Sequence, residues 1–186
     1  MKKVLVVVDM QNDFIDGSLG SDAAKAIVPN VVEKIKNFDG NIIFTKDTHF
    51  EKPFFNYPAY QYSLEGKLLP VPHCMIDKDL NKTHGNEINV DVFEAAALKN
   101  GYCWDIDPKF TFGDIYIRKY FANGIPDEIE ICGLCTDICV VSNALILRAM
   151  FPNTPIKVDP SCCAGTTPEN HEAALKVMKS CQIEVI

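Results

Sequence analysis

The sequence predicts an α/β fold, with a single domain over residues 1–186 and a doubly wound, mostly parallel six-stranded sheet that carries helices on both faces. The first observation is length, because 186 residues is close to the size of one domain. The second is the alternation of short apolar runs with longer segments of helical periodicity. The third is the continuous run VLVVV at residues 4–8, which is typical of a strand buried on both faces of a parallel sheet.

The expected elements follow one another along the chain. Pro29 marks the start of the first helix, Asp39 and Gly40 mark its end, and Thr136 is a suitable N-cap for the third helix. The six expected strands span residues 4–8, 41–45, 114–119, 128–134, 155–159 and 183–186. The four expected helices span residues 30–38, 90–98, 137–150 and 168–180. Residues 46–87 show little periodicity, and a loop that long in a compact domain is usually functional.

Charge and hydropathy exclude several classes of partner. The chain carries 18 Lys and Arg against 25 Asp and Glu, a net charge of −7, with no basic cluster that could neutralise a row of phosphates. Nucleic acid is therefore not an expected partner. The longest apolar run, residues 4–8, is far shorter than the ~20 residues of a membrane span, and the start MKKVLVVVDM is too short for a signal peptide. We expect a cytoplasmic protein that acts on a small molecule.

The eight cysteines do not indicate a disulfide framework. Several lie inside apolar elements, where a free cysteine behaves as a small hydrophobic residue, and thiols stay reduced in the expected compartment. Cys132, Cys135 and Cys139 have no second pair at the spacing of a zinc site, so a zinc ribbon is not expected.

Reactive side chains follow the expected strands at the points where these strands end. Asp9 comes after the first strand, Asp47 and His49 after the second, Lys119 ends the third, and residues 135–139 follow the fourth. Each has an ordinary structural interpretation on its own, such as a cap or a solvated charge. Ligands of open parallel sheets, however, bind beyond the carboxyl ends of the strands, so these residues together indicate a functional site.

Cys139 is the candidate nucleophile. It falls in the first turn of an expected helix, where free backbone N–H groups and the helix dipole stabilise a thiolate and lower its pKa. The same N–H groups could hold an oxyanion. No histidine has an obvious position beside it, but Asp9 could take the thiol proton while Lys119 stabilises the anionic states.

Three sequence segments resemble the signatures of the isochorismatase-like cysteine hydrolases, in the nicotinamidase-like branch. They are VVVDMQNDF at residues 6–14, IYIRKYF at 115–121 and GLCTDICV at 133–140, and the closing segment at 159–175 is also similar. The resemblance implies that Asp9, Lys119 and Cys139 form a catalytic triad.

The resemblance also implies further site features. The backbone N–H groups of Cys135 and Cys139 would form an oxyanion hole, with a cis peptide between Leu134 and Cys135. Gln11 and Phe14 would contact the substrate. Family members are commonly dimers or tetramers, so a homo-oligomer is expected.

The long loop resembles the metal-binding segments of nicotinamidases. TKDTH at residues 45–49 and EGKLLPVPHC at 65–74 imply Asp47, His49 and His73 as ligands of a divalent ion. Two imidazoles and one carboxylate suit Zn, Fe or Mn.

The chain also departs from the pattern of this branch. Many nicotinamidases have a Trp where this chain has Pro70, and that Trp and Phe14 would enclose the substrate ring. Tyr57, Tyr60 or Tyr62 could supply another aromatic wall, or could pack the loop instead. The segment after His73 is longer than usual, and Tyr120-Phe121-Ala122 follows Lys119 where Ser-Ala-Phe is common.

The expected function is hydrolysis of a small amide through a Cys139 thioester, with nicotinamide as the favoured substrate. An isochorismatase-type or carbamoyl-amide hydrolase on the same fold is an alternative, and a catalytically silent metal- or ligand-binding protein is an alternative of another class. A phospho-receiver domain is disfavoured because it places its Lys after the fifth strand. No G-x-G-x-x-G follows any strand, so dinucleotide binding is not expected.

Overall fold

The main sheet contains six parallel strands in the order β6-β2-β1-β7-β8-β9. This computed structural model describes residues 2–76, 83–99, 104–121 and 124–186. The strands are β1 (Lys3–Val8), β2 (Asn41–Asp47), β6 (Trp104–Lys109), β7 (Glu128–Leu134), β8 (Ile156–Ala164) and β9 (Glu184–Val185). The expected parallel α/β fold is confirmed.

The first strand lies at the centre of this sheet. β1 pairs in parallel with β2 on one side and with β7 on the other, and Leu5, Val6, Val7 and Val8 are completely buried. A strand with both edges paired and both faces covered must be apolar throughout, which accounts for the run of β-branched residues.

The expected third strand is wrong. Residues 117–121 form a short 3-10 helix, η2 (Ile117–Phe121), and the strand that pairs with β2 is β6. β6 contains Pro108, which has no N–H for a sheet ladder and is tolerated on an edge strand. Because β6 stands at the edge of the main sheet, this proline fits there.

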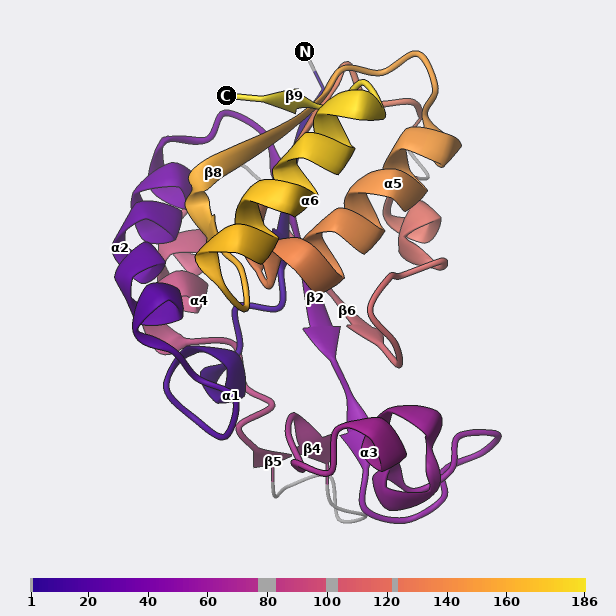
Figure 1. Ribbon diagram of the computed structural model, residues 1–186. Coiled ribbons are helices and arrows are strands. Elements are labelled where there is room, and N and C mark those ends of the chain that lie inside the picture. The colour runs from indigo at the N-terminus through magenta and orange to yellow at the C-terminus, as the bar shows by residue number, and fades with distance from the viewer. Residues whose placement is uncertain (1, 77–82, 100–103, 122–123) are drawn as a thin grey trace.

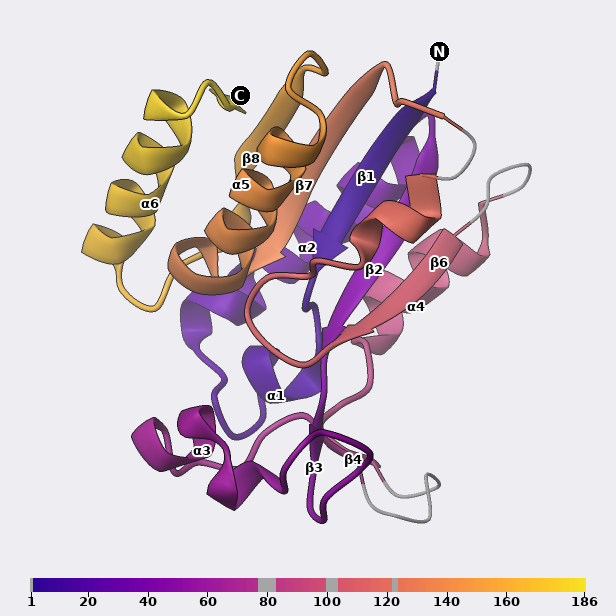
Figure 2. The same ribbon diagram turned by 90° about the vertical axis from the view of Figure 1, so that its right-hand side faces the viewer.

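Helices cover both faces of the sheet. Figures 1 and 2 show α2 and α4 on one face and α5 and α6 on the other. The helices are α2 (Asp22–Asn37), α4 (Val90–Ala97), α5 (Val141–Met150) and α6 (Pro168–Ser180). The first begins earlier than expected, because Ser21 accepts a hydrogen bond from the Ala24 N–H as its N-cap and Pro29 lies inside the helix. In the described part of the chain, no helix is both long and apolar enough to cross a membrane.

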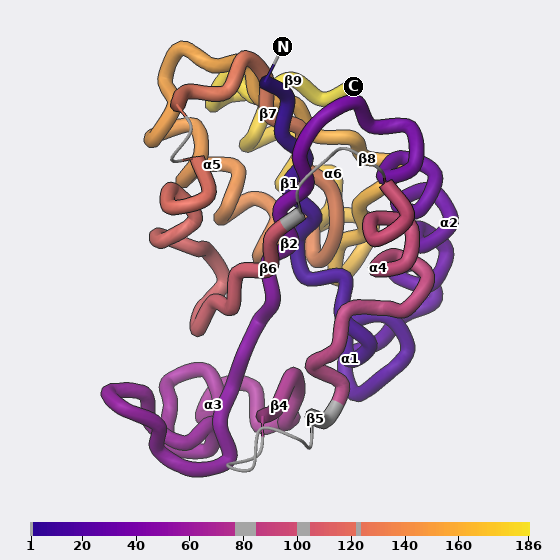
Figure 3. Tube along the Cα trace, turned by 180° about the vertical axis from the view of Figure 1, so that it is seen from behind, coloured from indigo at the N-terminus to yellow at the C-terminus, as the bar shows by residue number. Residues whose placement is uncertain are grey.

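The segment after β2 forms a small separate layer beyond the carboxyl end of that strand. Figure 3 shows this layer, with α3 and a second sheet, at one end of the main sheet. Its elements are β3 (His49–Phe50), η1 (Tyr60–Tyr62), α3 (Leu64–Leu68), β4 (Met75–Ile76) and β5 (Thr83–His84). A short helix α1 (Asn12–Ile15) follows β1 and leads toward the same end of the sheet. The carboxyl ends of the central strands therefore face a layer of irregular chain.

Candidate active site

Three buried side chains meet at the carboxyl ends of the strands. Asp9 follows β1, Lys109 is the last residue of β6, and Cys139 lies in the turn after β7. The Lys109 Nζ lies 2.6 Å from Asp9 Oδ2 and 3.6 Å from Cys139 Sγ. The other carboxylate oxygen of Asp9 accepts a 2.7 Å hydrogen bond from the Thr45 hydroxyl. A carboxylate, an ammonium and a thiol are thus in mutual contact.

The lysine of this cluster is Lys109, so the expected assignment of Lys119 is wrong. The Lys119 side chain is 54% exposed and pairs with Asp107 at 2.7 Å, whereas the Lys109 side chain is 1% exposed. Lys119 lies in η2 because its segment does not form the third strand. The unusual Tyr120-Phe121-Ala122 continuation was the sequence signal against it; Ala122 lies outside the described residues.

Burial and neighbouring charges shift the pKa values of all three groups. Burial raises the pKa of Asp9, although Lys109 opposes this effect. Burial also raises the pKa of the Cys139 thiol well above its usual value, against the attraction of Lys109. This direction is opposite to the lowering that was expected from a helix start. Burial disfavours the charged form of Lys109, but Asp9, Cys139 and Asp47 outweigh it and raise the pKa of the amine.

The turn that carries Cys139 differs from an ordinary helix start. Residues Thr136–Val140 form one turn of π-helix, η3, and α5 continues from it. Cys135 holds the N-cap position without a side-chain hydrogen bond, and the Thr136 hydroxyl contacts His171 Nδ1 at 2.8 Å instead of capping. The Leu134–Cys135 peptide bond is cis, as the resemblance implied. The Cys135 carbonyl accepts hydrogen bonds from the N–H groups of Ile138 and Val140, on either side of Cys139.

Four side chains form a second cluster that could hold a metal ion. Asp47, His49, Glu65 and His73 each offer one ligand atom, and these atoms lie within 4.8 Å of one another. The structure therefore brings together the three expected ligands and adds Glu65, from the first turn of α3. The sequence segment that begins with Glu65 predicted only His73 as a metal ligand.

The donor set of this cluster fits a divalent ion. His49 Nε2 lies 2.9 Å and His73 Nε2 lies 3.4 Å from Asp47 Oδ2, and the two nitrogens lie 3.7 and 3.5 Å from Glu65 Oε1. With its proton on Nδ1, His73 donates to the Val71 carbonyl at 2.8 Å and leaves Nε2 for the ion. Two imidazoles with two carboxylates suit Zn, Fe or Mn.

The pKa values of this cluster reflect close opposite charges. Burial alone would raise the pKa of Asp47, but Lys109, His49 and His73 lower it. Burial also opposes the charged form of His73, yet Asp47 and Glu65 raise its pKa to about 10. The carboxylates of Asp47 and Glu65 thus favour positive charge at this position, which suits a cation site.

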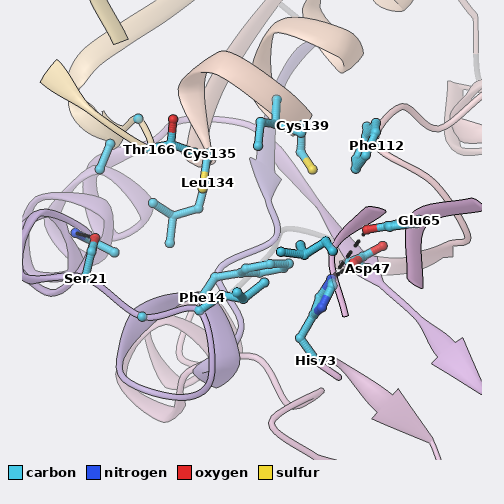
Figure 4. A pocket seen from close by; sticks show the side chains of 17 residues that line it. Phe14, Ser21, Asp47, Glu65, His73, Phe112, Leu134, Cys135, Cys139 and Thr166 are labelled. Atoms are coloured by element: carbon cyan, nitrogen blue, oxygen red, sulfur yellow. Dashed lines mark hydrogen bonds and ion pairs between the residues drawn. The ribbon is translucent and has the colours of Figure 1, made fainter. Parts of the chain in front are cut away.

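One pocket joins the two clusters. It encloses about 410 Å³, and the Cys139 sulfur points into it, with Asp47, Glu65 and His73 at the other side (Figure 4). Its lining is mainly apolar apart from these groups: Phe14, Leu19, Gly20, Ser21, Ala24, Asp47, Glu65, Leu69, His73, Phe112, Leu134, Cys135, Ile138, Cys139, Ala164, Gly165 and Thr166. A small molecule can thus reach the thiol and the second cluster at once.

Of the aromatic residues considered for the substrate walls, Phe14 alone lines the pocket. Phe14 lines the pocket and packs against His73, with ring centroids 5.5 Å apart. Tyr60 is buried against His49 and His73, so it packs the loop. Tyr57 packs on Phe110 and the side chain of Tyr62 is exposed.

A second aromatic residue and an aliphatic one complete the lining. Phe112, from the segment after β6, and Leu69, next to Pro70, both line the pocket. Neither was expected from the sequence.

Gln11 does not line the pocket, which contradicts its expected contact with substrate. It is completely buried, and its side-chain amide donates to the Asp47 carbonyl and accepts from the Asp47 N–H. Its polar atoms are therefore bonded to the protein backbone.

Known proteins are similar to this chain in sequence and fold. The family model described as the isochorismatase domain matches residues 3–186. The nicotinamidase of Saccharomyces cerevisiae is 25% identical over an alignment of 219 residues, which covers 99% of this chain and 99% of that protein. The crystal structure of a nicotinamidase/pyrazinamidase from Bacillus subtilis matches with a TM-score of 0.80 at 24% identity, over 100% of this chain and 99% of that one. The crystal structure of a pyrazinamidase from Pyrococcus horikoshii in complex with zinc matches with a TM-score of 0.73 at 26% identity, over 100% and 99%. With a match that spans nearly its whole length, the chain belongs to the isochorismatase family.

Proposed function

We propose that this protein is a cysteine amidohydrolase that converts nicotinamide to nicotinate and ammonia. The observation that carries the proposal is the contact of Lys109 with both Asp9 and Cys139, in a pocket that also holds a metal-type cluster. The nicotinamidase names among its relatives support the same substrate.

The reaction begins with transfer of the Cys139 proton to Asp9. The raised pKa of Asp9 makes it a better base than an ordinary carboxylate, and Lys109 lies where it stabilises the thiolate that forms. The thiolate adds to the amide carbon. When the tetrahedral intermediate collapses, the C–N bond breaks and Asp9 returns its proton to the departing ammonia, which leaves a thioester on Cys139.

Hydrolysis of the thioester completes the cycle. Asp9 takes a proton from a water molecule, the hydroxide adds to the acyl carbon, and the carbon–sulfur bond breaks. The sulfur regains the proton from Asp9 as the acid is released. In both steps, the backbone N–H groups of Cys135 and Cys139 are the proposed donors to the oxyanion.

The second cluster would hold a divalent ion, with Asp47, His49, Glu65 and His73 as its ligands. When bound, such an ion would act as a Lewis acid that binds the pyridine nitrogen of the substrate and water. Phe14 and Phe112 are the proposed aromatic walls of the ring site, since both line the pocket. Phe112 would thereby serve in place of the Trp that is absent at Pro70.

The test is ammonia release from nicotinamide, measured with and without a chelator. We expect chelator-sensitive release by the wild type and its loss in Cys139→Ala, because only the thiol can form the acyl bond. Cys135→Ala is the matched control and should retain most activity, since only its backbone is proposed to act. Equal loss in both variants would contradict the choice of nucleophile, and no release by the wild type would favour a different amide or a carbamoyl substrate.

Three further expectations stay predictions. They are the cytoplasmic location, a homo-oligomeric state and the extent of the single domain over residues 1–186. Sedimentation of the purified protein tests the second directly.

A further inference from the structure

Two buried amide side chains hold the segments that carry the metal-type cluster. The Gln11 Nε2 donates to the carbonyls of Asp47 (2.9 Å) and Asn86 (3.0 Å), and its Oε1 accepts from the Asp47 N–H at 2.7 Å. The Asn86 Nδ2 donates to the carbonyl of Asp47 at 2.9 Å and to that of Cys74 at 2.8 Å. Both amides are completely buried.

These contacts connect three segments that are distant in the sequence. Asp47 carries one candidate ligand, and Cys74 directly follows the candidate ligand His73. The Cys74 carbonyl that Asn86 binds also accepts from the N–H of His49 at 3.1 Å. Asn86 therefore binds the backbone of Asp47 and of the residue after His73, and it shares the Cys74 carbonyl with the N–H of His49.

The first motif of the chain anchors Asn86 itself. The Asn12 N–H donates to the Glu87 carbonyl and the Asp13 N–H to the Gly85 carbonyl, on either side of Asn86. The Asp13 carboxylate also accepts from the Cys74 N–H at 2.6 Å. Residues 85–87 thus form a strap that joins the segment after β1 to the irregular layer through hydrogen bonds.

The hydrogen bonds of Asn86 indicate what this side chain contributes. Its Oδ1 is buried and has no hydrogen-bond partner among the described residues, whereas both of its strong contacts come from Nδ2. A buried amide carbonyl without a partner costs stability, so the benefit of asparagine here lies in its two donors.

We propose that Asn86 is a positioning residue for the metal site, and that it works together with Gln11. It fixes the backbone of Asp47 relative to that of Cys74, and so sets the distance between the carboxylate of Asp47 and the imidazole of His73 before an ion arrives. Outer contacts of this kind change metal affinity by about 10- to 100-fold when they are removed. The inference rests on the metal site of the proposed function.

The experiment compares Asn86→Ala with Asn89→Ala in binding Zn²⁺. Asn89 is the matched control because its side chain also forms hydrogen bonds with the backbone, but as the N-cap of α4, where it accepts from the N–H groups of Asp91 and Val92. The measurements are the dissociation constant of Zn²⁺, by titration in competition with a chelator, and the melting temperature of each metal-free variant.

We expect Asn86→Ala to weaken Zn²⁺ binding about 10-fold or more. Asn89→Ala should lower the melting temperature through its lost cap while leaving the dissociation constant within about twofold of the wild type. If Asn86→Ala does not fold, Asn86→Ser supplies the same comparison with a smaller polar group.

Three outcomes would overturn the inference, and they distinguish its failure from that of the proposed function. Wild-type affinity in Asn86→Ala, or equal weakening in Asn89→Ala, would refute the positioning role alone. Absence of Zn²⁺ binding by the wild type would refute the metal site of the proposed function as well.

Discussion

The two halves of the pocket are built in different ways. The nucleophile half takes Asp9 and Lys109 directly from the ends of paired strands and Cys139 from the turn after β7. The metal half takes Asp47 from the end of β2, but its other three candidate ligands come from residues 49–73, where the chain has only short elements. The backbone hydrogen bonds of the sheet fix the geometry of the first half. The geometry of the second half depends on individual side chains, such as Gln11 and Asn86, that bind its backbone.

Because of this difference, we expect substitutions to affect the two halves in different ways. Substitutions in the nucleophile half should remove chemistry without changing the backbone, because the strands fix it. Substitutions that loosen the metal half should act through the shape of the chain, even at residues that touch no ligand.

The largest effect is expected at Lys109. Lys109→Met removes the ammonium between Asp9 and Cys139, so kcat/KM should fall by about 10²-fold or more. Lys119→Met is the same change ten positions later, at a half-exposed ammonium that pairs with Asp107 and does not contact Asp9 or Cys139, and should keep activity within about twofold. Steady-state kinetics on both variants, with melting curves to check folding, show which lysine the reaction requires. A greater loss in Lys119→Met would restore the assignment made from the sequence.

An intermediate effect is expected at Gly85. It has a φ of +67°, and a Cβ there would lie 2.0 Å from the Asp13 carboxyl carbon, so Gly85→Ala should lower the free energy of unfolding by roughly 1–3 kcal/mol and weaken Zn²⁺ binding. Gly124→Ala separates backbone strain from this clash, because its φ is also positive (+111°) but the nearest atom to its Cβ lies 3.5 Å away. Chemical denaturation and Zn²⁺ titration compare the two. Identical Zn²⁺ affinities would argue that the strap does not support the metal half.

The smallest effect is expected at Asp114, in the segment between β6 and η2. Burial and the neighbouring Asp107 raise the pKa of Asp114 to about 7. Between the unfolded value of about 4 and this value, the folded protein binds more protons, so its stability should fall as the pH rises from about 4 to about 7. Asp114→Asn should flatten this dependence and be the more stable protein at pH 8. Denaturation at pH 5 and pH 8 checks the slope, and parallel slopes would exclude Asp114 as its source.

The sequence predicted the regular parts of the fold well, because those parts carry strong local signals. Residues 128–134 and 168–180 were predicted with the bounds that β7 and α6 have. The buried run of β1 and the N-terminal proline of α6 are signals of this kind.

The misses came from residues whose role depends on distant neighbours. Pro108 is untypical of a strand interior, and its tolerance in β6 depends on the edge position that only the sheet order gives. Because the third strand was expected at residues 114–119, the lysine at its end was Lys119 instead of Lys109. Asn86 offered no signal, because its partners Asp47 and Cys74 lie 39 and 12 residues away in the chain.

The edge position of β6 has a consequence for how this pocket can change. In the part of the chain that the structure describes, β6 is joined to the main sheet through β2 alone, while β1 and β7 each have two neighbours. Asp9 and the turn of Cys139 therefore follow strands that are paired on both sides, whereas the amine that contacts both ends a strand paired on one side only. Small shifts of β6 would change the position of the Lys109 charge beside the Cys139 sulfur without disturbing the core. Substitutions in this edge strand are therefore a way, in nature or in protein engineering, to adjust reactivity at little cost in stability.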